Sequence, residues 1–177
     1  MLIFAMAYSR SCAVKSIKSG RELRSSVLRN EETNAKLEHL AGRVAVFQLH
    51  RYIFFGSAAY VSEVVNGLVQ EQLSVSPVRR VVYFVFDWTH VEDIDVTALD
   101  VVHEMLSKLL KGAAGAPPQL VMADDEHVDI GPIKTAPGGD AKDEEEAGMR
   151  VVLFTGLSPR MRKSLAQAKV VQVIHEP

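Results

Sequence analysis

The composition of this chain limits the classes of protein to which it can belong. Its 177 residues suffice for one domain with a full hydrophobic core, and an apolar share of 47% excludes wholesale disorder. The net charge of −2 argues against a dedicated nucleic-acid binder, which would show a basic face. Cys12 is the only cysteine, so internal disulfide bonds and cysteine-based metal sites are excluded.

The N-terminal segment combines a short apolar run with a basic stretch. Residues 1–8 are apolar, but they are far fewer than the ~20 residues that span a bilayer. Residues 1–29 carry six Lys or Arg against one Glu, a net charge of +5. Basic residues after an apolar run are typical of the cytoplasmic end of a membrane helix, whereas a signal peptide carries its charge first. We expect residues 1–8 to end a membrane helix and 9–40 to form a basic juxtamembrane linker; an ordinary N-terminus is the alternative.

Residues 41–177 are expected to form one domain in which strands and helices alternate. The predicted strands are 43–49, 52–55, 79–86, 150–154 and 170–174, and the predicted helices are 58–73, 97–111 and 159–169. A break at His50 and Arg51 separates the first two strands, Ser57 can cap the first helix, and Ser158 can cap the last. This order predicts an α/β fold: a mostly parallel sheet with an N-terminal antiparallel hairpin and three main helices.

An acidic insert interrupts this order at residues 112–149. Between residues 124 and 146, nine Asp or Glu stand against two Lys, a net charge of −7. Such a composition cannot bury enough apolar surface to order itself, so we expect a flexible insert, with a short extra strand at 119–123. The insert is either a solvated loop or a docking segment for a basic partner surface.

Several polar residues follow predicted strands at the carboxyl edge of the sheet, where open α/β sheets bind ligands. Asp87 ends one strand, and an acidic loop over 87–96 is expected to lead to the helix opening at Thr97. A helix opening carries partial positive charge and unpaired N–H groups. Trp88 is expected to pack at the loop mouth or on a partner surface. The candidate ligand- or partner-binding residues are Asp87, Trp88, Asp95, Thr97, Thr155, Gly156 and Arg160.

Thr97 admits two interpretations. It either caps the helix, with Asp100 completing a capping box, or serves as a phosphorylated switch; we favour the cap. Asp87 and Asp95 could approach one cleft, but no nucleophile stands beside a base and no metal-ligand spacing occurs. We therefore assign no catalytic residue, metal or cofactor. Basic residues after the opening at 159 leave nucleotide binding as an open alternative.

Three segments resemble elements of a known family. Asp95-Val96-Thr97-Ala98-Leu99 after a strand, YIFFGSA at 52–58 and GLSPRMRKSLAQAKV at 156–170 resemble elements of the STAS domain. This domain occurs in bacterial anti-sigma-factor antagonists and at the cytoplasmic end of sulfate-permease-type (SulP) anion transporters. RSSVLR at 24–29 is similar to the linker that follows the last transmembrane helix of such permeases. Order and spacing agree over roughly residues 43–174 apart from the insert, and Arg51 departs where the family often has Gly.

The resemblance implies a non-catalytic regulatory domain on the cytoplasmic face of a membrane. Its expected partners are the transporter's membrane domain, a second protomer in a homodimeric transporter, and a regulatory protein, with no nucleic acid. The alternative is a free-standing phospho-switch that resembles anti-sigma-factor antagonists and binds a kinase-like partner through Thr97. In those antagonists the matching hydroxyl is phosphorylated.

Overall fold

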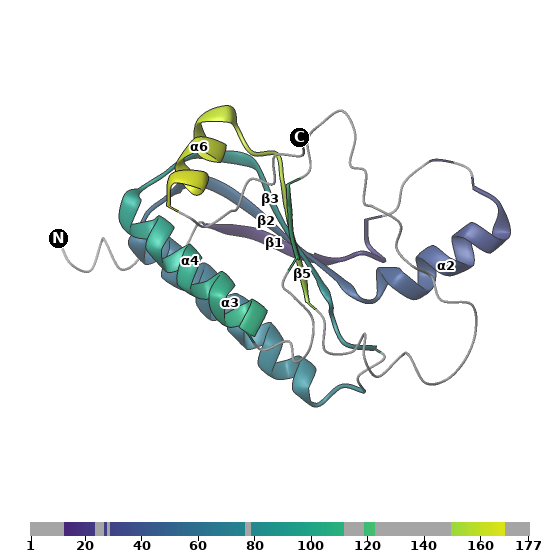
Figure 1. The fold of residues 1–177 in the computed structure, drawn as a ribbon. Coiled ribbons are helices and arrows are strands. Elements are labelled where there is room, and N and C mark those ends of the chain that lie inside the picture. The colour runs from purple at the N-terminus through teal and green to yellow at the C-terminus, as the bar shows by residue number, and fades with distance from the viewer. Residues whose placement is uncertain are drawn as a thin grey trace.

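The computed structural model in Figure 1 describes residues 13–23, 27, 29–76, 79–111, 119–122 and 150–168. Its strands are β1 (Val14–Ser19), β2 (Val44–Ile53), β3 (Tyr83–Ile94), β4 (Gln119–Met122) and β5 (Val151–Thr155), and its helices are α2 (Glu31–Ala41), α3 (Phe55–Leu73), α4 (Val96–Lys111) and α6 (Pro159–Gln167). The strands form one sheet in the order β1-β2-β3-β5-β4. Only β1 is antiparallel to its neighbour. The predicted α/β fold with a mostly parallel sheet is therefore confirmed.

The antiparallel pair at the N-terminal side of the sheet is built from other segments than the sequence predicts. The strand β1, which lies in the predicted linker, pairs with β2 from Val14 opposite Leu49 to Ser19 opposite Ala45. The predicted hairpin of 43–49 with 52–55 is wrong, because β2 runs unbroken to Ile53. Arg51 adopts a φ of 65°, in the left-handed region, so the chain accommodates the expected turn as a local irregularity within the strand.

A fourth helix, α2, joins the three predicted ones. Asn30 caps it by accepting a hydrogen bond from the Thr33 N–H at 2.9 Å. None of its residues is buried, and in Figure 1 it lies well apart from α3 and α4. It has no apolar stripe to reveal it in the sequence, and its stability rests on its cap and on local contacts such as the ion pair between Lys36 and Glu32.

The strand β3 continues through most of the segment expected to be a loop. Beyond Asp87, it pairs with β2 through His90 opposite His50, Val91 opposite Arg51 and Ile94 opposite Ile53, with two register shifts. Val91 and Ile94 are buried, so they hold the acidic stretch in the sheet. The predicted loop at 87–96 is therefore wrong, and the helix α4 begins two residues after β3 ends.

The residues at which the helices begin agree only in part with those predicted from the sequence. Ser158 caps α6 as predicted, accepting a hydrogen bond from the Met161 N–H at 3.3 Å. Ser57 is not the cap of α3, because that helix begins at Phe55; the Ser57 hydroxyl instead bonds both the N–H and the carbonyl of Phe54, each at 2.9 Å. The short strand predicted at 119–123 is confirmed as β4. Residues 1–8, the strand predicted at 170–174 and the rest of the insert lie outside the described residues.

The hydrophobic core lies between the sheet and the helices α3, α4 and α6 (Figure 1). An aromatic row crosses three strands, with ring centroids 5.1 Å apart between Phe47 and Phe86 and 5.7 Å apart between Phe86 and Phe154. Trp88 meets Phe154 edge-on at 5.8 Å. The buried helix residues opposite this row are Ala58, Val61, Val65, Ala98, Leu99, Val102, Met105, Leu106, Leu109, Met161 and Leu165. Each large side chain buried here contributes ~1.5–3 kcal/mol to stability.

The close contact between the end of β5 and β3 yields a stability prediction. Gly156 has a φ of +67°, and a Cβ there would lie 2.6 Å from the Thr89 amide nitrogen and would also clash with the Thr89 hydroxyl. We expect Gly156→Ala to lower the free energy of unfolding by ~2 kcal/mol or more. Denaturant unfolding followed by the fluorescence of Trp88 measures this change.

Gly67→Ala is the matched control. Gly67 is exposed within α3, and a Cβ there meets nothing within 4 Å. Because alanine is the better helix former, this variant should gain up to ~1 kcal/mol. Equal stability of the two alanine variants would contradict the contact between Gly156 and Thr89.

Candidate functional site

Asp95 and Thr97 lie where β3 passes into α4. The Thr97 N–H donates to Asp95 Oδ1 at 2.8 Å, and the Thr97 hydroxyl donates to Asp95 Oδ2 at 2.6 Å. Asp95 is therefore the residue that caps α4, and its carbonyl accepts the first helical bond from Leu99 at 3.1 Å. The predicted cap at Thr97, with its capping box to Asp100, is wrong, because Thr97 already lies in the first helical turn. Its side chain is exposed, while Ala98 beside it is fully buried.

A second Asp-x-Thr unit in β3 repeats this geometry. The Thr89 N–H and hydroxyl both donate to Asp87 Oδ1, at 3.0 and 2.6 Å. The other oxygen of Asp87 accepts a long bond of 3.5 Å from the Gln48 amide, whose oxygen accepts from the Ser16 hydroxyl at 2.7 Å. A polar chain thus links β1, β2 and β3 on the sheet face opposite the aromatic row. The shared spacing of Asp87-Trp88-Thr89 and Asp95-Val96-Thr97 is the sequence signal that identifies Thr89, which the prediction missed.

The two aspartates do not share a cleft. Asp87 lies within the sheet, opposite Thr155 of β5, whereas Asp95 lies beyond the end of β3. Seven residues of bulged strand separate them, roughly 20 Å at the usual rise of a strand. Thr155 and Gly156 join Asp87 and Thr89 in one group, while Thr97 belongs with Asp95. The sequence-based expectation that both carboxylates could approach one cleft is therefore wrong.

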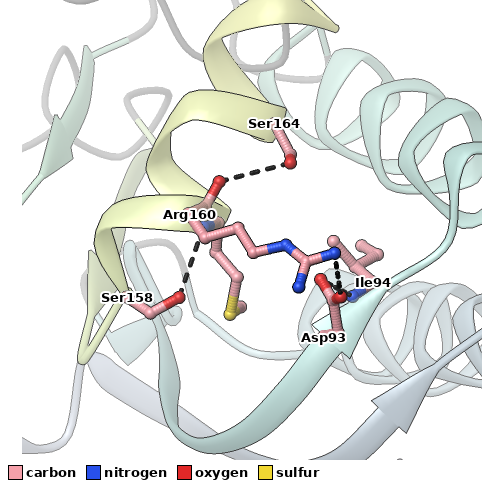
Figure 2. A network of polar contacts seen from close by, with 6 residues as sticks. Asp93, Ile94, Ser158, Arg160 and Ser164 are labelled. Atoms are coloured by element: carbon pink, nitrogen blue, oxygen red, sulfur yellow. Dashed lines mark hydrogen bonds and ion pairs between the residues drawn. The ribbon is translucent and has the colours of Figure 1, made fainter.

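Arg160 bridges α6 to the strand extension. Its guanidinium lies 3.0 Å from Asp93 Oδ2, and Asp93 Oδ1 also accepts from the Ile94 N–H at 3.0 Å (Figure 2). The Arg160 side chain is 80% exposed, so the pair itself contributes at most ~1 kcal/mol. A phosphate at the opening of α6 would have to compete with Asp93 for this guanidinium. Asp93 was not among the predicted site residues, because an acidic residue in an expected loop gives no signal of its partner.

Trp88 does not lie on a surface. It is 1% exposed, points to the same face as Phe84 and Phe86, and packs against Phe154. Its indole N–H has no hydrogen-bond partner among the described residues. The expectation that Trp88 meets a ligand or partner is therefore wrong, since the alternation of β3 directs it into the core.

Hydrogen bonding sets the acidity of both aspartates. Bonds from the Thr97 side chain and backbone lower the pKa of Asp95 below its usual value, against a small opposing effect of desolvation. At Asp87, burial raises the pKa, but the bonds from Thr89 and Gln48 outweigh it, and the net pKa is also lowered. Both groups are thus ionised at neutral pH. A lowered folded-state pKa contributes stability above the unfolded-state pKa, and this contribution is lost as the pH falls through the folded value.

In the ranges that the structure describes, no three His, Cys, Asp or Glu side chains gather where they could hold a metal ion. No helix in those same ranges is both long and apolar enough to cross a membrane.

One family model matches part of the chain. Residues 37–114 match the family model of the STAS domain. The matched range runs from the second half of α2 to just beyond α4, so it includes β2, the β3 extension, and the Asp95–Thr97 unit. This match to part of the chain supports a regulatory or binding role in general. No curated protein matches the chain.

The shared hydrogen bonds predict a site-specific titration. Thr97→Val removes the hydroxyl that donates to Asp95 but keeps the backbone N–H, so the pKa of Asp95 should rise toward its usual value of ~3.9. Carboxyl ¹³C chemical shifts followed against pH measure this. The matched variant Thr89→Val should raise the pKa of Asp87 and leave that of Asp95 unchanged. If both aspartates responded alike to either change, the pairing of each carboxylate with its own threonine would be refuted.

Proposed function

We propose that this chain is a non-catalytic regulatory domain on the cytoplasmic face of a SulP-type anion transporter. In this proposal, the STAS domain contacts the transporter's membrane domain, a second protomer or a regulatory protein. The sequence supports it through the apolar run at 1–8, the basic stretch that follows, and the transporter-like run at 52–58. An apolar segment followed by a cationic segment is not expected in a soluble switch.

The observation that carries the proposal is the surface around Thr97. We call Asp95, Val96, Thr97, Tyr52 and Phe55 the Thr97 surface. Phe55 is 59% exposed and its N–H donates to the Asp95 carboxylate, and Val96, which precedes Thr97 in the chain, is 74% exposed. The first turn of α4 is held in place by the buried Ala98 and Leu99. A fixed polar group framed by exposed apolar side chains is a feature of binding surfaces.

A free-standing phospho-switch is the second candidate, and the exposed Thr97 hydroxyl favours it. A phosphate there would bring a charge of about −1.5 to −2 next to the ionised Asp95 and would remove the hydroxyl's hydrogen bond to that carboxylate. The surface would then change in both charge and geometry. This candidate predicts phosphothreonine at position 97 in protein isolated from cells, and a reading frame without membrane segments upstream of Met1.

The transporter proposal predicts the opposite reading frame. About ten or more apolar segments of membrane-spanning length should precede Met1 in the same frame. Their absence would overturn the transporter context and leave the STAS domain as a soluble binding module.

Binding through the Thr97 surface is testable with two substitutions. Thr97→Glu should weaken association with the detergent-solubilised membrane domain encoded in the same frame by about tenfold, because an added carboxylate must be desolvated beside Asp95. The fold should persist, since a negative charge suits the opening of a helix. Thr97→Val, which matches the threonine in shape, should bind much closer to wild type. Equal affinities for wild type and both variants would show that this surface is not the contact site.

A further inference from the structure

Two arginines lie close together at the amino edge of the sheet. Arg80 stands shortly before β3, and Arg150 directly precedes β5. The Val151 N–H donates to the Val82 carbonyl at 2.9 Å, so these two strands begin side by side. Burial lowers the pKa of Arg150, and the charge of Arg80 lowers it further, which requires the two guanidinium groups to be near each other. Both residues are half-buried, and we call them the arginine pair.

Each guanidinium of the arginine pair binds backbone carbonyls at the end of a helix. Arg80 donates from Nε to the Val75 carbonyl at 2.9 Å and from Nη2 to the Leu73 carbonyl, the last of α3, at 3.2 Å. Arg150 donates from Nη1 to the Leu109 carbonyl, in the last turn of α4, at 2.9 Å. The carboxyl end of a helix carries about half a negative charge, so two such ends leave about one positive charge of the pair uncompensated.

No carboxylate balances this charge among the residues that the structure describes. Each hydrogen bond that Arg80 or Arg150 makes with them goes to a backbone carbonyl, and neither guanidinium forms an ion pair with them. Half-buried like charges are unfavourable unless an anion lies beside them. An arginine side chain has five N–H donors, so both guanidiniums retain donors for such an anion. The arginine pair is therefore suited to bind carboxylates.

The chain carries its longest run of consecutive carboxylates just before Arg150. Residues 143–146 are DEEE, and residues 147–149 alone separate them from Arg150. At ~3.5 Å for each extended residue, the chain tethers these four residues within about 25 Å of the Arg150 backbone. A short flexible tether of this kind gives an effective concentration in the mM range. This run is therefore the carboxylate source nearest to the arginine pair along the chain.

We propose that residues 143–146 bind to the arginine pair within the same molecule. Guanidinium and carboxylate groups pair through two parallel hydrogen bonds, and Arg150 keeps its Nε–H for such a pair, since it bonds Leu109 through Nη1 alone. The contact neutralises the charge that the two helix ends leave, and it makes part of the acidic insert a ligand of its own domain. The inference goes beyond the proposed function and is independent of it, because it rests on neither residues 1–8 nor the Thr97 surface.

The exchange of the Arg150 Nε–H with water, measured by NMR on the full chain labelled with ¹⁵N, tests this contact. Asp143→Asn/Glu144→Gln/Glu145→Gln/Glu146→Gln should speed the exchange at least about threefold in about 0.01 M salt, because the donor loses its carboxylate. In about 1 M salt, where the Debye length falls from about 30 Å to about 3 Å, wild type and variant should exchange alike. A variant that exchanges at the wild-type rate in the low salt would overturn the inference and leave the proposed function untouched.

Asp124→Asn/Asp125→Asn/Glu126→Gln/Asp129→Asn is the matched control. It removes the same number of charges from the same insert, but at positions more than 20 residues before Arg150. Its exchange rate should stay close to that of wild type. An equal acceleration in both variants would overturn the inference, because the effect would then follow from the net charge of the insert.

Dilution separates a contact within one molecule from a contact between two copies. About tenfold dilution of the wild-type chain should leave the exchange rate unchanged, because a tethered segment keeps its effective concentration. A rate that rises on dilution would assign the carboxylates to a second copy and would also overturn the inference. The fluorescence of Trp88, which is buried in the core, checks that each variant is folded.

Discussion

The pairing of β2 with β3 is the constraint on which the rest of the structure depends. Both strands run past the end of β5, so their last residues, Ile53 and Ile94, meet beyond the body of the sheet. Since α3 follows β2 almost at once and α4 follows β3 just as closely, this pairing fixes both helix openings side by side. The two helices then lie next to each other beside the sheet (Figure 1). The positions of α3 and α4, their packing against each other and the location of the Thr97 surface all follow from the parallel pairing of β2 with β3.

The two Asp-x-Thr units place one local hydrogen-bond pattern in two different surroundings. In each, a carboxylate accepts from the N–H and hydroxyl of the threonine two residues later. The unit at Asp87 lies within the sheet and is joined to β2 and β5, so its bonds fasten strands together. The unit at Asp95 lies at a helix opening, and its threonine faces solvent beside exposed apolar side chains. The surroundings, and not the motif, therefore distinguish the unit that joins strands from the unit for which we propose a binding role.

The elements that bury apolar side chains were predictable, and the elements that do not were missed. Periodic apolar residues located β5 and α3, α4 and α6, and Ser158 marked the start of α6. The helix α2 has no buried residue, and in β1 each of the two apolar residues is followed by a lysine and a serine, so neither element carries a core pattern. Acidic residues, which are poor strand formers, hid the extension of β3, although Val91 and Ile94 hold it. At the site, Asp95 and Thr97 can both cap a helix, and only the observed helix start decides between them. For Trp88, the alternation with Phe84 and Phe86 already indicated that the side chain lies in the core.

The strand β1 also has a protective role that follows from its place at the margin of the sheet. None of the described strands lies beyond β1, so its outer side presents backbone N–H and carbonyl groups, which is the arrangement that lets sheets of separate molecules join edge to edge. Lys15 and Lys18 place charge along this margin, and the register shift between Val14 and Ser16 bends it. Both features are known deterrents to such joining. Lysines at the edge of β1 would therefore keep neighbouring copies of the domain apart even where they are crowded together.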